Sequence, residues 1–305
     1  MIAFVGVDAG GSHTEAAVAG PDLTPLGRHR GPSGRLDATI DDPATPIIAV
    51  VRTVCEQASV PLPATAAVIG AAGAGAQELR DRLRDALMLA GIAHRVAVTT
   101  DLEIAFCAAF DDGPGMLISA GTGSVAAARD EAGRFTKVGG YGWRVGDEGS
   151  AAALGRAALQ AALRTEDRRG GTTALLDALR LQMHAQDRLG DVHLIRAAGP
   201  GDFAALVPTV IATAQAGDAV AAQLLVETVD ALVRHVTALR VATGDGAGRT
   251  VALNGGLLAH DSVIRDTFVD QLARAHPDLR VRAEAVDPLR GALALAQRLE
   301  QVRAR

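Results

Sequence analysis

The sequence predicts an α/β fold with two lobes, and three observations support this prediction. The chain has 305 residues, which suggests two domains of about 150 residues each. Short apolar runs alternate with longer segments of helical spacing, as in α/β proteins. The order of apolar run, glycine turn, apolar run and polar turn occurs twice, from residue 2 and again from residue 116. We therefore expect an internal duplication, with one such hairpin opening each lobe.

The first half of the chain alternates between predicted strands and helices. Short apolar runs that are too brief for helices predict strands over 2–8, 16–19, 66–70 and 96–101, with a further strand starting at Leu26. Helical spacing predicts helices over 46–58 and 77–90, and in the second helix Leu79, Leu83 and Leu87 lie four residues apart. Gly91 marks the end of the second helix.

The second half restarts with a hairpin and is then mostly helical. Strands are expected over 116–119, 125–129 and 250–253, and an alanine-rich helix over 149–164. Asp218 is expected to cap a long helix that ends at Gly244. Pro288 is expected to open a last helix over 289–299.

Composition excludes several classes of function. The net charge is −5 with both signs interleaved, which argues against a nucleic-acid-binding face. Two cysteines cannot form a disulfide framework or a four-thiolate metal site. No apolar run approaches the ~20 residues of a membrane span, and the first residues lack a basic signal segment. We expect a cytoplasmic protein that binds neither nucleic acid nor membrane.

The glycine turns suit a phosphate ligand. Gly10 and Gly11 follow one buried strand, and Gly121 and Gly123 follow another. Glycine lets backbone N–H groups approach a phosphate closely. Nearby hydroxyl groups could add donors: Ser12, Thr14, Thr122 and Ser124. The alternative is two ordinary hairpin turns.

A metal ion would have to share in balancing the phosphate charge. Lys137 is the sole lysine and lies outside any G-x-x-x-x-G-K-[ST] pattern, so a Walker-type site is excluded. Asp8, at the end of the first strand, is the natural carboxylate for Mg²⁺, bound through water.

The run 121–126 also fits the dinucleotide fingerprint G-x-G-x-x-G/A. That fingerprint requires a helix after the turn, whereas the short run 125–129 meets a polar turn and favours a hairpin. No acidic residue ends a following strand about 20 residues on, where a ribose partner belongs.

Asp101 allows two interpretations. At the end of an apolar strand it could be the base that deprotonates an attacking hydroxyl. It could instead be the N-cap of a helix over 102–110, and this alternative is favoured while Asp101 is considered alone.

The segment 139–150 carries the only tyrosine and the only tryptophan of the chain, Tyr141 and Trp143. Aromatic faces stack on sugar rings, and Asp147 and Glu148 could accept hydrogen bonds from several hydroxyls. Exposing both aromatics without a ligand would be costly. The alternatives are a hydrophobic plug under a surface loop, and a capping role at the start of the following helix for Asp147, Glu148 or Ser150.

Other segments carry weaker signals. Asn254, Gly255 and Gly256 follow a strand and form a third close-approach turn, suited to a flat purine. The eight histidines show no metal-ligand spacing, and no G-x-S-x-G elbow is present.

Taken in order, these motifs resemble the sugar kinases of the actin/hexokinase/Hsp70 ATPase superfamily. The resemblance is closest to the BadF/BadG/BcrA/BcrD branch, which contains N-acetylglucosamine kinase, and it covers nearly the whole chain. The motifs that carry it are 7–14 and 119–124 for the phosphates, 99–101 for the catalytic aspartate, 254–256 for adenosine, 288–296 for the connecting helix and, most specifically, 146–151.

The sequence differs from N-acetylglucosamine kinases in the segments expected to contact the sugar. Those enzymes usually read Gly-Gly-Trp-Gly-His before Gly-Asp-Glu-Gly, and here Tyr141, Trp143 and Arg144 alter that stretch. The sugar-contacting Asn of the family is not evident at 32–35. The segment 141–148 looks closer to actinobacterial glucosamine kinases, and Glu148 would suit a free ammonium group.

The resemblance implies a duplicated ribonuclease-H-like fold with an interlobe cleft, of the actin/hexokinase type. The lobes would be 1–112 with 288–305, and 113–287. It further implies a kinase that uses ATP and Mg²⁺ to phosphorylate the 6-hydroxyl of glucosamine, or of N-acetylglucosamine as the alternative. Asp101 would be the base, Asp8 would hold the hydrated metal ion, and the glycine turns would grip the phosphates. We also expect a homodimer.

Two other functions compete. An ATP-dependent activator of a radical dehydratase or reductase belongs to the same branch, but it would need cysteines at a dimer interface. Cys55 and Cys107 lie far apart, in apolar segments of helical spacing. A sugar-sensing regulator would usually carry an N-terminal helix-turn-helix, for which the strand beginning at residue 2 leaves no room.

Overall fold

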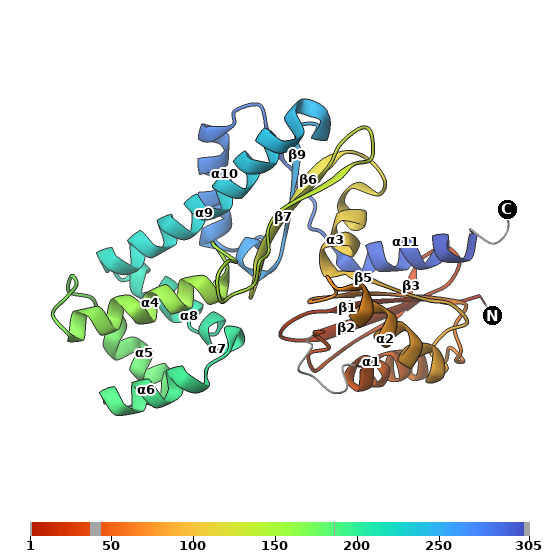
Figure 1. Cartoon of the computed structure of the whole chain (residues 1–305), viewed down its shortest axis with the longest axis horizontal. Coiled ribbons are helices and arrows are strands. Elements are labelled where there is room, and N and C mark those ends of the chain that lie inside the picture. The colour runs from red at the N-terminus through yellow and green to blue at the C-terminus, as the bar shows by residue number, and fades with distance from the viewer. Residues whose placement is uncertain (1, 37–43, 186, 302–305) are drawn as a thin grey trace. The chain divides into compact units, whose positions relative to one another are not determined.

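A computed structural model describes residues 2–36, 44–185 and 187–301 of the chain (Figure 1). The chain divides into two compact units, Met1–Gly113 with Val286–Arg305, and Pro114–Ala285. Each unit contains one five-stranded sheet.

Unit 1 is a mixed sheet with helices on both faces. Its strands are β1 (Phe4–Ala9), β2 (Thr14–Ala19), β3 (Pro25–Gly31), β4 (Ala66–Ala71) and β5 (Val96–Thr100). Its helices are α1 (Ala44–Gln57), α2 (Gln77–Leu89), α3 (Asp101–Phe110) and α11 (Pro288–Gln301). The strand order is β3-β2-β1-β4-β5; β1–β2 and β2–β3 pair antiparallel, while β4 and β5 pair parallel to their neighbours.

Alternation along β1 assigns one set of side chains to each face of this sheet. Val5 and Val7 pack in a core with residues of α1 and α2. Phe4 packs in a second core with Ile104 of α3 and Leu293 of α11. Gly6 and Gly70 face the same side as Phe4, where a Cβ at Gly70 would lie 2.4 Å from the Ile104 side chain. The glycines therefore let α3 and α11 approach the sheet closely.

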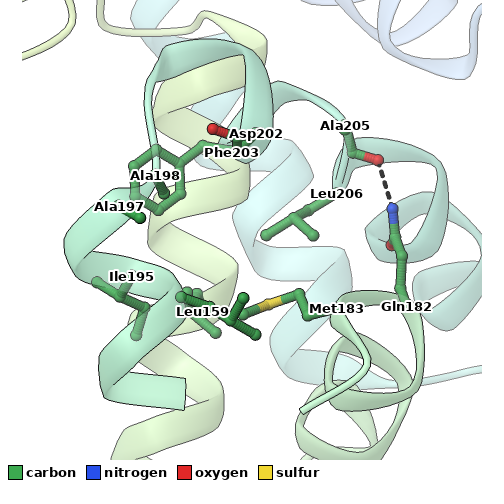
Figure 2. Close-up of a pocket in the computed structure, with 11 residues that line it drawn as sticks. Leu159, Gln182, Met183, Ile195, Ala197, Ala198, Asp202, Phe203, Ala205 and Leu206 are labelled. Atoms are coloured by element: carbon green, nitrogen blue, oxygen red, sulfur yellow. Dashed lines mark hydrogen bonds between the residues drawn. The ribbon is translucent and has the colours of Figure 1, made fainter. Parts of the chain in front are cut away.

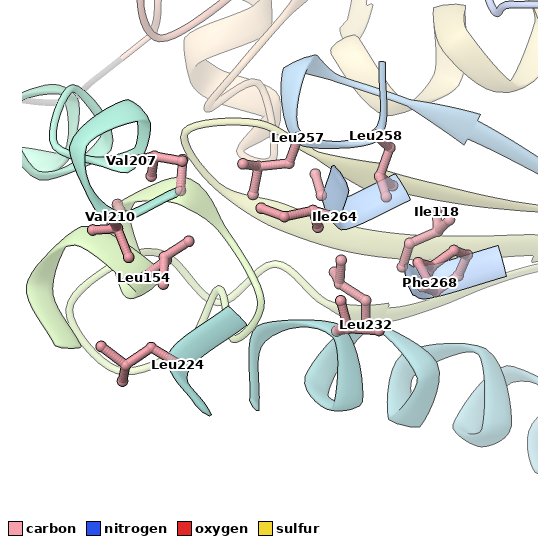
Figure 3. Packing of buried hydrophobic residues seen from close by; sticks show 14 of the residues in the cluster. Ile118, Leu154, Val207, Val210, Leu224, Leu232, Leu257, Leu258, Ile264 and Phe268 are labelled. Atoms are coloured by element: carbon pink, nitrogen blue, oxygen red, sulfur yellow. The ribbon is translucent and has the colours of Figure 1, made fainter. Parts of the chain in front are cut away.

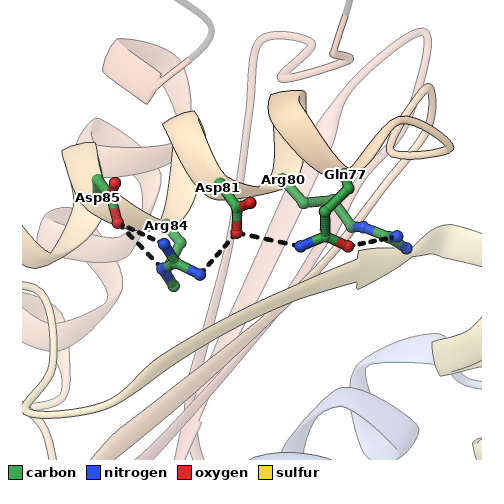
Figure 4. Close-up of polar contacts among 5 residues, drawn as sticks. All are labelled: Gln77, Arg80, Asp81, Arg84 and Asp85. Carbon is green, nitrogen blue, oxygen red and sulfur yellow. Dashed lines mark hydrogen bonds and ion pairs between the residues drawn. The ribbon is translucent and has the colours of Figure 1, made fainter.

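The outer surface of α2 is polar (Figure 4). Arg84 donates to Asp81 over 2.6 Å and to Asp85 over 2.9 Å, and Gln77 donates to Asp81. Exposed pairs of this kind contribute little to stability. The inner side of α2 carries Leu83 and Leu87 into the core, as the fourfold spacing predicts.

Unit 2 repeats the sheet and adds a helical segment. Its strands are β6 (Gly115–Ala120), β7 (Ser124–Arg129), β8 (Phe135–Gly139), β9 (Thr250–Asn254) and β10 (Arg280–Val281). Its α-helices are α4 (Ala151–Glu166), α5 (Leu175–Met183), α6 (Arg188–Ala197), α7 (Pro200–Ala204), α8 (Val207–Gln215), α9 (Ala219–Thr243) and α10 (Val263–Ala275). Two short 3₁₀ helices are η1 (Gly244–Ala247) and η2 (Gly256–Leu258).

The strand order is β10-β9-β6-β7-β8. Read from the other edge, β8-β7-β6-β9-β10 matches β3-β2-β1-β4-β5 of unit 1 strand for strand. The hairpins correspond as well, since Ala9 pairs with Thr14 in one and Ala120 with Ser124 in the other. The predicted duplicated α/β fold is therefore confirmed. Because β7 runs antiparallel to β6 directly after the glycine turn, the dinucleotide-binding alternative is excluded.

The core of unit 2 lies between its sheet and the long helices. Ile118 of β6, Leu232 of α9 and Phe268 of α10 belong to one buried cluster (Figure 3). Asp218 caps α9 as predicted, accepting a hydrogen bond from the Ala221 N–H over 2.9 Å.

Within the described ranges, no single helix is both long and apolar enough to cross a membrane. The bent pair Gly190–Ala197 and Pro200–Gln215 passes that test only when its two halves are taken together.

Candidate active site

The first glycine turn closes the β1–β2 hairpin. The Gly10 N–H donates to the His13 carbonyl over 2.9 Å, and the Ser33 hydroxyl donates to the Gly10 carbonyl over 2.9 Å. Gly11 and Ser12 are exposed, and a Cβ on Gly11 would meet no heavy atom within 4 Å. The turn therefore leaves open space above its backbone, as close approach by a ligand requires.

Thr14 differs from the other residues of this turn. It is the first residue of β2, its side chain is completely buried, and its hydroxyl has no hydrogen-bond partner among the described residues. The turn thus presents Gly10, Gly11 and Ser12 rather than the Thr14 hydroxyl.

The second glycine turn is held by α4. The Gly121 N–H donates to the Gly123 carbonyl over 2.9 Å, which repeats the bond across the first turn. The carbonyls of Gly121 and Thr122 accept hydrogen bonds from the N–H groups of Ala151 and Ala152, over 2.9 and 3.3 Å. In a trans peptide the carbonyl and the following N–H point in opposite directions. The N–H groups of Thr122 and Gly123 therefore point away from α4.

The expectation that the Ser124 hydroxyl is a phosphate donor is not met. Its side chain is buried, and its hydroxyl donates to the Glu148 carbonyl over 2.7 Å. It is therefore engaged with the segment 139–150 rather than presented to a phosphate.

The segment 139–150, called the site loop below, depends on unusual backbone conformations. Gly139, Gly140, Gly142 and Gly149 have φ between 70° and 91°, and Asp147 has φ 58°. The buried Asp147 carboxylate accepts the Gly142 N–H over 3.1 Å. Positive φ is uncommon outside glycine, but aspartate adopts it more readily than most residues. Asp147 can therefore hold this position while its carboxylate accepts the Gly142 N–H.

The site loop also packs on α9. A Cβ on Gly139 would lie 2.3 Å from the ring of His235, and one on Gly149 would lie 2.8 Å from Leu232. Side chains are thus excluded at both ends of the loop. Ser150 is the N-cap of α4 and accepts the Ala153 N–H over 3.1 Å, so the cap falls to Ser150 rather than to Asp147 or Glu148.

The two aromatic residues of the loop have different surroundings. Tyr141 is 81% exposed, whereas Trp143 is partly buried and packs against the core. The Trp143 ring lies 6.1 Å from that of Phe203 and 4.9 Å from the Arg144 guanidinium. Of the two aromatic residues expected to be exposed, only Tyr141 is. Trp143 instead forms the hydrophobic plug under the loop that was the alternative interpretation.

Phe203 also lines a cavity in the helical segment of unit 2, with a volume of about 320 Å³. Figure 2 shows Phe203 near Ala197 and Ala198, with Leu206 and Met183 farther along the cavity. None of the residues predicted to act on a substrate lines it.

Two carboxylates lie at the carboxyl edge of the sheet in unit 1. Asp8 is near the end of β1, and Asp101 directly follows β5. Burial raises the pKa of Asp8 from 3.8 to about 7, assisted by the negative charges of Asp101, Glu15 and Asp287. These carboxylates are therefore close enough to interact electrostatically.

The structure decides between the two interpretations of the start of α3. Thr100 is the N-cap: its hydroxyl accepts the Glu103 N–H over 3.1 Å, and the Glu103 carboxylate accepts the Thr100 N–H over 3.0 Å. Asp101 is the first helical residue and is exposed. The capping role predicted for Asp101 in isolation is therefore wrong.

The donor groups fit a hydrated magnesium ion. Among the described residues, no group of three His, Cys, Asp or Glu side chains could enclose a metal ion. A partly buried single carboxylate at Asp8, beside an open glycine turn, suits an ion that keeps most of its water and binds phosphate oxygens.

The third turn follows β9. The Asn254 side chain donates to the Ser119 hydroxyl over 3.0 Å. Gly255 has φ 92°, and a Cβ there would lie 2.4 Å from the Ala120 carbonyl oxygen. Asn254–Gly256 thus packs against the strand that leads into the second glycine turn.

Sequence reasoning missed several supporting residues. Ser33 and Glu103 hold the first turn and the start of α3, and Asp287 adds charge beside Asp8 while pairing with Arg28. A capping box can be read at Thr100 and Glu103, because Thr-x-x-Glu is its signature. The other contacts join residues far apart in the chain and have no local signal.

Comparison with known proteins agrees with the predicted family. The family model for the BadF/BadG/BcrA/BcrD ATPase family matches residues 5–296. The chain belongs to this family.

Individual relatives match the chain over nearly its full length. An N-acetylmuramic acid/N-acetylglucosamine kinase from Clostridium acetobutylicum is 27% identical over 96% of this chain and 97% of its own. A crystal structure from Chromobacterium violaceum, described as a candidate N-acetylglucosamine kinase, is 26% identical with a TM-score of 0.82, covering 97% of this chain and 99% of that one. A ROK family glucokinase from Streptomyces griseus, solved with glucose and AMPPNP, shares the fold at 19% identity and a TM-score of 0.61, covering 97% and 99%.

Proposed function

We propose that this protein is an ATP-dependent amino-sugar kinase that transfers the γ-phosphoryl group to the 6-hydroxyl of glucosamine. The observation that carries the proposal lies in unit 1. Asp8 and Asp101 interact at the carboxyl edge of the sheet where Gly10 and Gly11 close the first hairpin. A metal-binding carboxylate, a base and a phosphate turn are the groups that phosphoryl transfer needs.

Each group has a distinct task in the proposed reaction. Asp101 accepts the proton of the sugar hydroxyl as its oxygen attacks phosphorus in line with the leaving ADP. Asp8 holds hydrated Mg²⁺, which when bound neutralises phosphate charge. The N–H groups of the glycine turns bind phosphate oxygens, and Asn254, Gly255 and Gly256 provide the surface for adenine.

The site loop is proposed to bind the sugar through its exposed residues Tyr141, Arg144 and Glu148. Trp143 and Asp147, which were also expected to contact the sugar, support the loop instead. Trp143 packs on Phe203, and the buried Asp147 carboxylate accepts the Gly142 N–H. Glu148 is exposed, and its carboxylate has no ion-pair partner among the described residues. The Arg144 guanidinium lies over the Trp143 ring instead. An uncompensated carboxylate suits a substrate ammonium group, which supports glucosamine.

The alternative substrate is N-acetylglucosamine. It is supported by the printed names of the Clostridium acetobutylicum and Chromobacterium violaceum relatives. The iron–sulfur activator is less well supported, because Cys55 and Cys107 are both buried.

The decisive experiment is an ATP-consumption assay with glucosamine, N-acetylglucosamine, glucose and N-acetylmannosamine. We expect the highest kcat/KM with glucosamine, and ³¹P–¹H correlation spectra that place the phosphate on C6. ATP consumption with none of the four sugars would refute the proposed kinase activity.

Glu148→Gln separates the two amino sugars. Losing a charge-assisted hydrogen bond should raise the KM for glucosamine at least about tenfold, while the KM for N-acetylglucosamine changes little. Equal effects on both substrates would remove Glu148 from ammonium recognition.

A further inference from the structure

The second glycine turn and the end of the site loop are joined by a compact set of contacts within unit 2. The Ser124 hydroxyl donates to the Glu148 carbonyl over 2.7 Å. The N–H groups of Ala151 and Ala152 donate to the two turn carbonyls described above. Gly123 lies against Asp147, because a Cβ on this glycine would sit 2.8 Å from the carboxylate oxygen Oδ2. The turn, the loop end and the start of α4 are therefore linked by direct contacts.

Among these contacts, only the bond from Ser124 is made by a side-chain donor. The others are backbone hydrogen bonds or close packing, which a substitution cannot remove without changing the backbone. Ser124 is 3% exposed, so its side chain is almost entirely shielded from water. Its loss would leave the Glu148 carbonyl without this bond and the loop end without its side-chain link to the turn.

The internal duplication supplies a comparison for Ser124. Thr14 occupies the matching register position in the first hairpin. Its hydroxyl is buried and has no hydrogen-bond partner among the described residues. The hairpin itself therefore does not need a hydrogen-bonded hydroxyl at this position. In unit 2 the hydroxyl serves the site loop.

We propose that Ser124 is a positioning residue that fixes Glu148 relative to the second glycine turn, so that sugar recognition and nucleotide binding reinforce each other. This inference rests on the proposed function for the identity of the two ligands. The N–H groups of Thr122 and Gly123 point away from α4. A phosphate bound to these N–H groups would order the turn further. Ordering the turn orders the Glu148 main chain through Ser124, and a sugar bound at Glu148 acts in the reverse direction.

The test compares three variants of the full-length chain. Ser124→Ala removes only the hydroxyl. Ser124→Thr retains the hydroxyl, and threonine already stands at the matching position of the first hairpin, as Thr14. The control is Thr213→Val in α8, which removes a buried hydroxyl that donates to the Thr209 carbonyl over 2.8 Å, away from the site loop. Thermal unfolding, KM for sugar and for ATP, kcat, and hydrogen exchange of the peptide covering 140–152 are measured for each.

We expect Ser124→Ala to raise the KM for the sugar about tenfold, with a smaller rise for ATP and a nearly unchanged kcat. Hydrogen exchange over 140–152 should accelerate. Thr213→Val should lower the melting temperature while leaving both KM values and this exchange unchanged, and Ser124→Thr should restore wild-type behaviour. If Ser124→Ala does not fold, Ser124→Cys, a weaker donor of similar size, should show the same pattern to a lesser degree.

Two outcomes would overturn the inference. If Ser124→Ala and Thr213→Val both lower stability and leave the KM values unchanged, Ser124 is merely structural. If only the KM for ATP rises and exchange over 140–152 is unchanged, the hydroxyl acts on the nucleotide. If the wild type consumes no ATP with any sugar, the proposed function fails, and hydrogen exchange still decides whether Ser124 orders the loop.

Discussion

Replacing Asp8 by asparagine should make the protein more stable at neutral and alkaline pH. The carboxyl group of Asp8 has its pKa raised from 3.8 to about 7, first by burial and then by the charges of Asp101, Glu15 and Asp287. The folded protein therefore binds this proton more tightly than the unfolded chain does. Between about pH 4 and pH 7 the free energy of unfolding must fall as pH rises.

The size of the effect follows from the displaced titration. About three pH units correspond to about 4 kcal/mol of unfolding free energy, which is an upper limit because neighbouring carboxylates adjust. The loss is complete above pH 7 and absent below pH 4. Asparagine is nearly isosteric and does not ionise. The advantage of Asp8→Asn should therefore be close to zero near pH 4 and grow to a few kcal/mol at pH 8.

The assay is urea denaturation of both proteins from pH 4 to 8, with EDTA present and without nucleotide. At each pH the unfolding free energy of the wild type is subtracted from that of Asp8→Asn. This difference removes the contribution of titrating groups that the two proteins share. Asp278→Asn is a control of opposite sign, because its hydrogen bond from Arg240 lowers the pKa of Asp278. That substitution should destabilise at neutral pH, and the difference should disappear in acid. The reasoning would be refuted if the unfolding free energies of wild type and Asp8→Asn changed with pH in parallel. It would also be refuted if Asp8→Asn were less stable than wild type at pH 8.

Three further substitutions follow from the structure. Asp101→Asn should lower kcat by several orders of magnitude with little change in sugar affinity, and near-normal turnover would exclude Asp101 as the base. Gly291→Ala should destabilise by about 3 kcal/mol or more, because its Cβ would lie 1.9 Å from the Ile104 carbonyl oxygen; a melting temperature within a degree of wild type would contradict the α3–α11 packing. Thr14→Val should stabilise by about 1 kcal/mol by removing a buried hydroxyl without a partner, and a loss of stability in urea titrations would show that this hydroxyl is satisfied.

The local pattern of the sequence was sufficient for most elements. Apolar runs of strand length, leucines at fourfold spacing and Asp218 at a helix start are signals carried by neighbouring residues, and the structure places β1, α2 and α9 there. The duplication could also be predicted, because it appears as a repeated order of elements.

The sequence by itself determined the α/β class, the repeated hairpin and the glycine turns, because each depends on backbone preferences over a few residues. Tertiary structure decided what those residues contact. It assigned the helix cap to Thr100 instead of Asp101, directed the Ser124 hydroxyl to Glu148, and packed Trp143 on Phe203. The physical reason is that hydrogen bonds, burial and charge interactions join residues distant in the chain, and their partners are specified only once the sheets and helices have packed.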